Sequence, residues 1–395
     1  MRTPARTQVA IVGAGPAGLL LSHLLHLHGI ESVVLEARSR EYVEHRVRAG
    51  VLEQGTVDTL VESGAGERLL REGLVHHGIE LRFGGQRHRI AFEKLVPGRA
   101  ITVYGQQEVV KDLIAARQAA DGRILFEVDD VVPEGIESPH PQVSFTHRSR
   151  RLALQADFIA GCDGFRGVCR DAIPPGVLQF FDKEYPFGWL GVLAAVAPSS
   201  EELIYSSNDR GFALHSMRSP QLSRFYLQVA PDEDIGAWPD ERIWAELTAR
   251  LETVPCWTLA TGPVVEKGIT AMRSFVAEPM QFGRLFLAGD AAHIVPPTGA
   301  KGLNLAAFDV TVLTEAFAAW YSSGDAALLD GYSRACLRRV WRAQHFSWWM
   351  TTLLHSFDSY DAYDRRLQQS YRDYVCTSEA ASTSLAENYV GLAHV

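Results

Sequence analysis

Cysteine is scarce in this chain of 395 residues. The five cysteines are odd in number, and no two of them have the C-x-x-C spacing; they are Cys162, Cys169, Cys256, Cys336 and Cys376. This pattern argues against a disulfide framework and against a zinc site, and the sequence indicates no other metal site. Reduced thiols are typical of cytosolic proteins, so we expect a cytoplasmic location.

Several other features are absent. No uninterrupted apolar run reaches the roughly 20 residues needed to cross a bilayer. The apolar stretch near the N-terminus is broken by glycines and lacks a persuasive signal-peptide cleavage site. Internal repeats and low-complexity tracts are missing, and 38 basic against 47 acidic residues give a net charge of −9. We therefore expect neither a membrane nor a nucleic acid as a partner.

The composition that remains is that of a globular protein, with 47% hydrophobic and 22% charged residues. A chain of this length is too long for one compact core, so two or three lobes are expected.

The N-terminal segment carries a glycine fingerprint, Gly13-Ala-Gly15-Pro-Ala-Gly18. An apolar strand pattern at Gln8–Val12 precedes it, and a helical pattern from Leu19 follows. A second strand is expected at Ser32–Leu35, after which Glu36 stands about 20 residues beyond the fingerprint, where an acid binds ribose hydroxyls. Because strand, turn and helix are all in register, the segment predicts a dinucleotide-binding unit.

A second cofactor-type segment lies far downstream. An apolar run from Gly283 ends in Gly289-Asp290, which predicts a strand with a carboxylate at its tip, and a Gly/Pro-rich turn then opens a helix at Gly302. A helix N-terminus of this kind favours an anion or an electron-rich ring edge. Another Asp-Gly turn, at Asp163, follows a predicted strand. Two cofactor-binding segments so far apart in the sequence indicate a long cofactor such as FAD, and hence a redox enzyme.

We expect an α/β fold with a Rossmann-like FAD-binding domain, a β-sheet-rich substrate domain and a helical C-terminal region. The first part of the FAD-binding domain spans residues 1–176, with a helix at Val109–Ala120. The substrate domain spans 177–272 and contains a helix at Asp240–Leu251. Residues 273–395 return to the FAD-binding domain and then form the helical region. Strands of the substrate domain are expected at Trp189–Ala195, Glu202–Tyr205, Gly211–His215 and Ser223–Val229.

The helical region contains an aromatic stretch from Trp341 to Trp349. Such a stretch is more often a core or a subunit seam than a ring-stacking site. A helical tail this apolar needs a partner surface, so we expect a homodimer.

The chain resembles the single-component FAD-dependent aromatic hydroxylases over nearly its whole length. The first and third of the matching motifs occur in many flavoproteins, whereas the others are more specific. They are Gly13–Gly18, Arg46–Gly55, Val103–Gln106, Tyr185–Trp189, Arg210–Leu214, the Gly-Asp segment, Phe346–Thr351 and Glu387–Leu392.

The resemblance implies hydroxylation of 4-hydroxybenzoate to 3,4-dihydroxybenzoate with NAD(P)H and O2, through a flavin C4a-hydroperoxide. The alternative is a related flavin hydroxylase that acts on another hydroxy- or aminobenzoate. A flavin-binding sensor would need no substrate site, and the joint presence of five polar side chains argues against it: Tyr205, Ser216, Arg218, Tyr226 and Tyr389.

Three catalytic residues follow from the resemblance. Tyr205 would stabilise the substrate phenolate, Tyr389 would be its relay partner, and His76 would be the outer end of the proton path. His77 is a second candidate for that end. A tyrosine in an apolar strand is by itself usually a core residue, and only the matching surroundings favour these roles.

The resemblance also implies a substrate-binding set. Arg218 would bind the carboxylate through a bidentate fork that lysine cannot reproduce. Ser216 and Tyr226 would donate from their hydroxyls, and Pro297 would offer its backbone carbonyl near the phenol, since proline has no backbone donor. Tyr205 and Met217 complete the set.

For FAD, the resemblance assigns Glu36 to the adenosine ribose, Arg48 and Gln106 to the pyrophosphate and Asp290 to the ribityl chain. Residues from Lys301 onward would lie along the isoalloxazine, where a helix N-terminus favours negative charge. The full cofactor-binding set is Gly13, Gly15, Ala17, Gly18, Glu36, Arg46, Arg48, Gln106, Asp163, Asp290, Lys301, Gly302, Leu303 and Asn304.

The nicotinamide cofactor is expected to meet Arg38, Tyr42, Arg48, Arg166 and Arg273. In NADPH-dependent members an arginine directly follows the ribose-binding acid, whereas here Ala37 does and the arginines come later. We expect NADPH, with Arg38 or Arg40 at its 2′-phosphate, and NADH remains open.

Overall fold

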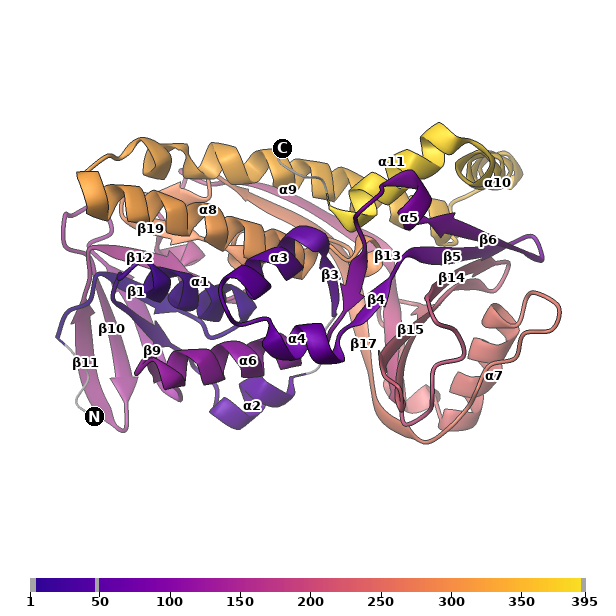
Figure 1. Ribbon diagram of the computed structural model, residues 1–395, viewed down its shortest axis with the longest axis horizontal. Coiled ribbons are helices and arrows are strands. Elements are labelled where there is room, and N and C mark those ends of the chain that lie inside the picture. The colour runs from indigo at the N-terminus through magenta and orange to yellow at the C-terminus, as the bar shows by residue number, and fades with distance from the viewer. Residues whose placement is uncertain (1–4, 47–49, 392–395) are drawn as a thin grey trace.

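The computed structural model describes residues 5–46 and 50–391 and shows two lobes side by side (Figure 1). One lobe holds the N-terminal strands and the long helices α8 (Gly302–Ser323) and α9 (Ala327–Leu354). The other holds a large sheet and helix α7 (Asp240–Leu251). Two strands of unusual length, β13 (Gln179–Ala194) and β17 (Val264–Glu278), pair with each other and connect the lobes.

The first lobe is built on a sheet whose described strands have the order β18-β19-β12-β1-β2-β8. The central pairs are parallel, and only β18 and β19 pair antiparallel. The strands are nearly continuous apolar runs because this sheet is buried in the main apolar core of the lobe. Their bounds are Gln281–Phe282, Leu285–Leu287, Phe158–Gly161, Val9–Val12, Ser32–Leu35 and Arg123–Leu125.

Helices α1 (Pro16–Leu27), α6 (Gln106–Ala119) and α8 pack together on this lobe. An antiparallel sheet of β9 (Val128–Glu134), β10 (Gln142–His147) and β11 (Arg150–Gln155) lies at its outer end. Between the lobes lie smaller elements: β3 (Val51–Glu53), α3 (Gln54–Glu62), α4 (Glu67–Glu72), β4 (Leu74–His76) and β7 (Ile101–Val103), with α2 (Arg40–His45) beneath α6.

The second lobe contains a sheet of order β20-β17-β13-β16-β15-β14-β5-β6. One face packs on α7, where Phe225 meets Ile243 and Leu247 in an apolar core. The opposite face, with Tyr205 and Phe212, packs on the end of α9 and on α11 (Glu379–Val390). The remaining strands are His293–Ile294, Leu222–Val229 (β16), Gly211–Ser219 (β15), Leu203–Asn208 (β14), Gly78–Phe83 (β5) and Gln86–Ala91 (β6).

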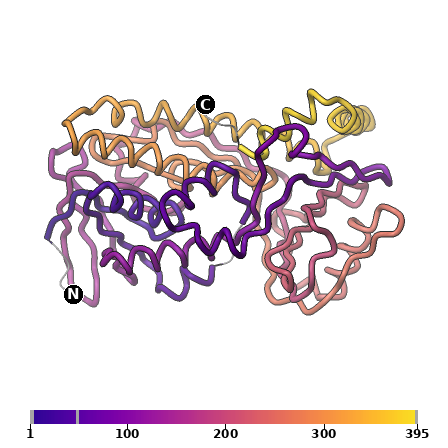
Figure 2. The backbone as a smooth tube through the Cα atoms, viewed as in Figure 1, coloured from indigo at the N-terminus to yellow at the C-terminus, as the bar shows by residue number. Residues whose placement is uncertain are grey.

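The C-terminal helices return to an early part of the chain. In Figure 2 the yellow C-terminal segment runs beside the purple segment of β5 and β6, and contacts between α11 and α5 (Phe92–Leu95) and between α10 (Ala362–Thr377) and β6 agree with this view. This return places Tyr389 next to the sheet that carries Tyr205.

The expected fold class is confirmed: the chain is α/β, with a mostly parallel sheet, a large and mostly antiparallel sheet and a helical C-terminal region. Strand β2 and helix α7 have the predicted bounds, and α8 opens at Gly302 as predicted. The division at residues 176 and 272 stays a prediction. The sheet topology does not follow this division strictly, because β5 and β6 precede residue 176 and yet belong to the large sheet.

The five cysteines are free thiols in the structure. Within residues 5–46 and 50–391, no group of three or more histidine, cysteine or acidic side chains is arranged to hold a metal ion. In that same part of the chain, α8 alone is long and apolar enough to span a membrane. It packs against α1 and α9, and this contact with the core accounts for its apolar character.

Candidate active site

The sheet of the second lobe aligns several predicted site residues on one face. Strand register places Tyr205 opposite Leu214, Leu214 opposite Tyr226, and Tyr226 opposite Gly191. Side chains alternate along a strand, so Ser216, two residues beyond Leu214, points to the same face. The pairing therefore brings three of the predicted substrate ligands together.

Arg218 is inserted among hydroxyl groups. Its Nη1 donates to Ser216 Oγ at 2.9 Å and to the Met217 carbonyl at 2.8 Å, and its Nη2 lies 3.5 Å from Tyr226 Oη. No Asp or Glu in the described part of the chain pairs with this guanidinium, and its buried Nε has no hydrogen-bond partner there. Desolvation lowers the pKa of Arg218 from its ordinary value, as expected for a partly buried cation that no described anion compensates.

A second arginine lies close by. The Arg224 guanidinium is 5.3 Å from the centre of the Tyr226 ring, and its nearest acid, Glu266, is 3.8 Å away. Gly191 makes this packing possible, because a Cβ there would stand 2.7 Å from Arg224 Nη2 and 3.2 Å from the Tyr226 ring. This end of the site is therefore positively charged, and it suits a carboxylate.

The other end of the site carries two buried tyrosines. The hydroxyls of Tyr205 and Tyr389 are hydrogen-bonded to each other, and Tyr205 also donates to the Thr298 carbonyl at 3.4 Å. Burial raises the pKa of both phenols above the ordinary tyrosine value. Both side chains thus remain neutral hydroxyls, able to donate to a phenolate.

The turn η4 (Pro297–Gly299) presents this carbonyl to Tyr205. The Pro297 carbonyl, which the resemblance assigned to the substrate, accepts the Ala300 N–H at 2.9 Å. Its role at the phenol stays a prediction. Sequence reasoning missed Thr298, because nothing in the sequence shows which carbonyl of a tight turn faces a side chain from a distant strand.

His76 is buried at the end of β4, and neither ring nitrogen has a hydrogen-bond partner in the described residues. Desolvation lowers the pKa of His76 to about 4. It lines an outer cavity of about 590 Å³ together with Ser199, Met217 and Pro220. The alternative candidate, His77, is exposed. No hydrogen bond among the described residues joins His76 to Tyr389, so the last step of the predicted relay stays a prediction.

A buried ion cluster that sequence reasoning missed supports the predicted flavin side. Lys301 Nζ donates to Glu53 Oε1 at 2.6 Å and to the Tyr389 carbonyl at 3.1 Å, while Arg339 donates to Glu53 Oε2 at 2.7 Å. Burial lowers the pKa of Lys301, and Glu53 opposes this effect. Two cations against one carboxylate leave the cluster positive. Lys301 was among the predicted cofactor ligands, whereas its partners Glu53 and Arg339 were not.

The start of α8 is fixed to β3 by Asn304. The Asn304 side chain accepts from Glu53 N at 2.9 Å and donates to the carbonyls of Val51 and Ala300. Gly302 and Leu303 remain partly accessible, and a Cβ at Gly302 would meet nothing within 4 Å. The helix N-terminus therefore has room for a ring edge, to which its dipole adds positive potential.

The glycine fingerprint has the geometry of a dinucleotide site. Gly13 has a φ of +104°, and a Cβ there would lie 2.3 Å from the Cys162 carbonyl oxygen; at Gly18 it would lie 2.0 Å from the Gly13 carbonyl oxygen. At Gly15 it would meet nothing within 4 Å. The first and third glycines thus close the turn, and the second leaves open space at the N-terminus of α1, where a pyrophosphate fits. Ala17 packs behind it, near Gly289 and Ala306.

The remaining predicted FAD ligands surround this turn. Glu36 accepts from the backbone N–H groups of Ala14 and Arg38, each at 2.7 Å, which joins the end of β2 to the fingerprint. Asp163 accepts from Cys169 N at 2.8 Å, and its buried Oδ1 has no described partner. Asp290 is exposed beyond β19, as predicted, and Gln106 begins α6. Arg48 lies outside the described residues.

The predicted nicotinamide ligands occur in two groups. The Tyr42 ring is flanked by Arg38 at 5.4 Å and Arg46 at 5.8 Å. Arg273 lies 4.7 Å from the Phe165 ring and pairs with Asp182, and Arg166 is exposed on the loop that carries Phe165. Neither group is shown to bind a ligand, so these assignments stay predictions.

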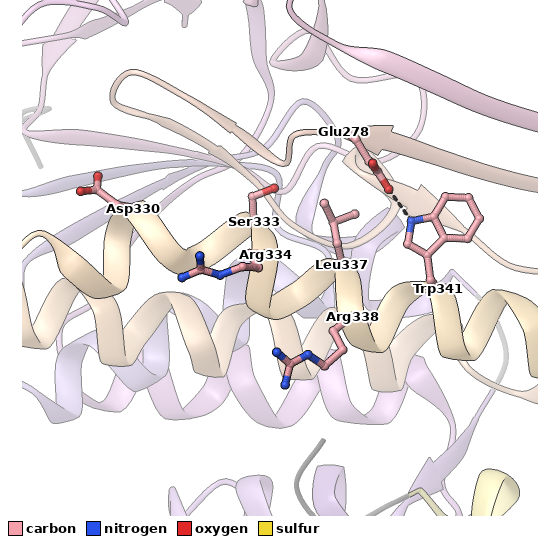
Figure 3. A pocket seen from close by; sticks show the side chains of 7 residues that line it. All are labelled: Glu278, Asp330, Ser333, Arg334, Leu337, Arg338 and Trp341. Carbon is pink, nitrogen blue, oxygen red and sulfur yellow. Dashed lines mark hydrogen bonds between the residues drawn. The ribbon is translucent and has the colours of Figure 1, made fainter.

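A separate surface hollow of about 580 Å³ lies along the outer side of α9 (Figure 3). Its lining contains none of the predicted site residues and consists of Glu278, Asp330, Ser333, Arg334, Leu337, Arg338 and Trp341. The chemistry of the candidate site is therefore not placed there.

Comparison with known proteins agrees with this geometry. Residues 6–347 match the family described as FAD binding domain. The chain is 50% identical, over 98% of its length and 96% of the relative's, to p-hydroxybenzoate hydroxylase from Acinetobacter baylyi. The chain belongs to the FAD-dependent aromatic hydroxylase family. FAD is accordingly its cofactor, and the open space at Gly15 and the N-terminus of α8 suit it.

More distant relatives show the same architecture. Rifampicin monooxygenase from Streptomyces venezuelae is 27% identical, over 82% of this chain and 67% of its own. The crystal structure of p-nitrophenol 4-monooxygenase from Pseudomonas putida superposes with a TM-score of 0.84 at 20% identity, over 98% of this chain and 99% of that one. At that identity the superposition shows the fold alone.

The different surroundings of Gly15 and Gly13 generate a test of the FAD site. We expect Gly15→Ala to leave the thermal stability of the apoprotein unchanged and to raise the Kd for FAD at least about tenfold, or about 1.4 kcal/mol, because its Cβ enters only the cofactor space. Gly13→Ala should destabilise the apoprotein itself by about 1–3 kcal/mol. Calorimetry and flavin fluorescence titration measure both. Normal FAD affinity in Gly15→Ala would contradict this placement.

Proposed function

We propose that this protein is a monooxygenase that hydroxylates 4-hydroxybenzoate at carbon 3 to give 3,4-dihydroxybenzoate. The reaction consumes O2, NAD(P)H and a proton, and it releases water and NAD(P)+ beside the product. The observation that carries the proposal is Arg218, a partly buried cation with no described acidic partner, set on the sheet face that also carries the Tyr205–Tyr389 pair. The 50% identical p-hydroxybenzoate hydroxylase supports it.

At the carboxylate end, Arg218 binds the substrate and supplies the countercharge. Ser216 and Tyr226 hold the guanidinium through their hydroxyls and orient it toward the ligand. Arg224 adds positive potential from the neighbouring strand. A ring anchored at its carboxylate then has a defined direction across the sheet.

At the phenol end, Tyr205 acts on the oxygen of the substrate. Its hydroxyl donates to that oxygen and stabilises the phenolate, which makes the ring electron-rich at carbon 3. Tyr389 is the hydrogen-bond partner through which a proton leaves Tyr205. The high pKa of both tyrosines keeps their protons on them until the substrate proton has to move.

When bound, FAD supplies the activation of O2 and the transfer of one oxygen atom. The protein residues hold the cofactor and adjust the local charge. Lys301 and Arg339 give the buried cluster around Glu53 an excess of positive charge, which favours anionic species beside the start of α8. The apolar side chains around Tyr389, among them Phe92 and Phe346, exclude water from the site.

Arg38 and Tyr42 form the surface that we propose for the adenosine end of NADPH. Arg40 is engaged by Glu44 at 2.6 Å, whereas Arg38 lies over the Tyr42 ring and makes no ion pair with a described acid. Arg38 is thus the better candidate for a 2′-phosphate, and NADH use stays open.

A three-step assay distinguishes this function from the alternative, a flavin hydroxylase for another hydroxy- or aminobenzoate. NADPH consumption is followed without substrate, then with 4-hydroxybenzoate, then with 3-hydroxybenzoate or 4-aminobenzoate. We expect 4-hydroxybenzoate to stimulate consumption most and to be converted to 3,4-dihydroxybenzoate. Stimulation and conversion by one of the other rings alone would favour the alternative.

We also propose that the protein is a homodimer that associates through α10. Tyr363, Leu367, Tyr371 and Tyr374 are exposed at spacings of four, four and three residues, so they form one apolar side of the helix. A soluble monomer rarely leaves such a stripe in water.

Leu367→Glu should therefore convert the dimer to a monomer, because burying a leucine contributes about 1.5–3 kcal/mol at each of the two symmetric positions. Leu328→Glu is the matched control, since Leu328 is about equally exposed at the start of α9. Sedimentation velocity measures the result. A dimer that persists in Leu367→Glu would place the interface elsewhere.

Replacing Arg218 by lysine tests the carboxylate site. A point charge cannot reproduce the bidentate fork, and the lost charge-assisted bond contributes about 1.5–3 kcal/mol. We expect the KM for 4-hydroxybenzoate to rise more than about tenfold. Steady-state kinetics measures this. A normal KM would show that another group binds the carboxylate.

Replacing Tyr205 by phenylalanine tests the phenol end, because it removes one hydroxyl and preserves the ring. The variant should bind substrate and consume NADPH, yet form little product and release hydrogen peroxide instead. Tyr389→Phe should have the same effect more mildly, since it acts one hydrogen bond further away. The ratio of product to NADPH consumed measures both. Full coupling in Tyr205→Phe would refute its role.

Arg38→Ala tests the nicotinamide surface. If Arg38 contacts the 2′-phosphate, kcat/KM for NADPH should fall about tenfold, as for the loss of one charge-assisted bond, and kcat/KM for NADH should not change. Arg40→Ala is the control, because Glu44 already engages that side chain. An unchanged NADPH/NADH ratio in Arg38→Ala would show that another surface reads the phosphate.

A further inference from the structure

A histidine outside the predicted site is bonded at both ring nitrogens. His355 directly follows α9 and is fully buried. Its Nε2 accepts the indole N–H of Trp189 at 2.7 Å, and its Nδ1 donates to the Thr351 carbonyl at 3.0 Å. Because an indole nitrogen only donates, Nε2 must carry no proton. His355 is therefore a neutral imidazole, and its burial, which lowers its pKa to about 3, keeps it neutral.

The imidazole is also held in place by stacked rings. Phe187 lies parallel to it at 4.6 Å between ring centres, and Phe212 stacks on it at 4.3 Å. The ring is thus fixed in position as well as in protonation, and so is the nitrogen to which Trp189 is bonded.

From Trp189 a short chain of contacts leads to the carboxylate end of the site. The Trp189 ring packs on the Tyr226 ring at 4.8 Å between centres, and the Tyr226 hydroxyl lies 3.5 Å from Arg218 Nη2. Arg218 has no described acidic partner to hold it. Its orientation depends on these neighbours and on Ser216.

We infer that His355 is a positioning residue for substrate binding: through Trp189 and Tyr226 it holds the Arg218 guanidinium in the orientation that receives the substrate carboxylate. This inference rests on the proposed function. Its physical basis is the hydrogen bond from Trp189, which fixes the rotation of the indole, and the indole in turn limits where the Tyr226 ring can lie.

The test compares two variants, each of which removes one partner of the Trp189–His355 hydrogen bond. His355→Phe removes the acceptor, and Trp189→Phe removes the donor. Each should raise the Kd for 4-hydroxybenzoate about tenfold, the effect of one buried hydrogen bond, and leave kcat at saturating substrate nearly unchanged. His355→Gln keeps an acceptor oxygen and should largely restore affinity. The Kd is measured by titrating the flavin absorbance of the FAD-loaded enzyme.

Double variants that include Arg218→Lys distinguish a structural defect from a positioning role. In an Arg218→Lys background the guanidinium is already absent, so His355→Phe should have little further effect on the Kd. His23→Phe, at a buried histidine in the FAD-binding lobe with one ring hydrogen bond, is the control and should leave the Kd unchanged. FAD content and Tm show which variants fold. If His355→Phe does not fold, the same comparison is made with Trp189→Phe, in the unaltered enzyme and in the Arg218→Lys background.

Normal affinity in Trp189→Phe, or an equal loss of affinity with and without Arg218, would overturn the role of His355. An unaltered enzyme that neither binds nor hydroxylates 4-hydroxybenzoate would instead refute the proposed function. The two failures are therefore distinguishable.

Discussion

A partly buried guanidinium, which no acidic side chain of the described residues neutralises, is the constraint around which the second lobe is organised. Removing a charge from water costs several kcal/mol unless a partner compensates, and the hydroxyl and carbonyl groups around Arg218 satisfy its hydrogen bonds without neutralising it. The missing countercharge makes the site selective for a ligand that brings one. It also requires the surrounding strands and rings to hold the guanidinium in place while the ligand is absent.

The C-terminal half of α9 supplies much of that support. The Thr351 and Thr298 hydroxyls are hydrogen-bonded at 2.9 Å, and Gly299 packs so closely that a Cβ there would lie 2.7 Å from Ser347 Oγ. The turn that presents a carbonyl to Tyr205 therefore rests on the same helix whose end holds Trp189. Helix α9 thereby supports both the phenol end and the carboxylate end of the site. The fold therefore sets the distance between the two ends.

Local sequence patterns were sufficient for much of the fold. The fingerprint, β2, α7 and the start of α8 depend on neighbouring residues, such as an apolar strand followed by a glycine turn, and these were predicted correctly. The addition of β5 and β6 to the large sheet was not foreseen, because strand pairing across more than 100 residues leaves no local pattern. The full lengths of β13 and β17 were missed for a similar reason: the exposed half of each strand is stabilised by pairing with the more buried half of the other.

Some residues of the candidate site were likewise predicted from the sequence and others were not. Tyr205, Ser216, Arg218, Tyr226 and Tyr389 came from the resemblance, and the structure brings them to one side of the sheet. Glu53, Arg339, Thr298 and His355 were invisible in the sequence, since each acts through a contact with a residue that is distant along the chain. The role of His76 stays a prediction, because no hydrogen bond between described residues links it to Tyr389.

The central claim is that Arg218 binds the charge of a substrate carboxylate. The most direct measurement compares the Kd of the FAD-loaded enzyme for 4-hydroxybenzoate and for 4-hydroxybenzamide, which has nearly the same shape and no charge. Both values come from titrations of the flavin absorbance at one pH and ionic strength. A charge-assisted bond to the partly buried guanidinium predicts binding of the amide weaker by more than about tenfold. Equal affinity for the two ligands would contradict the account.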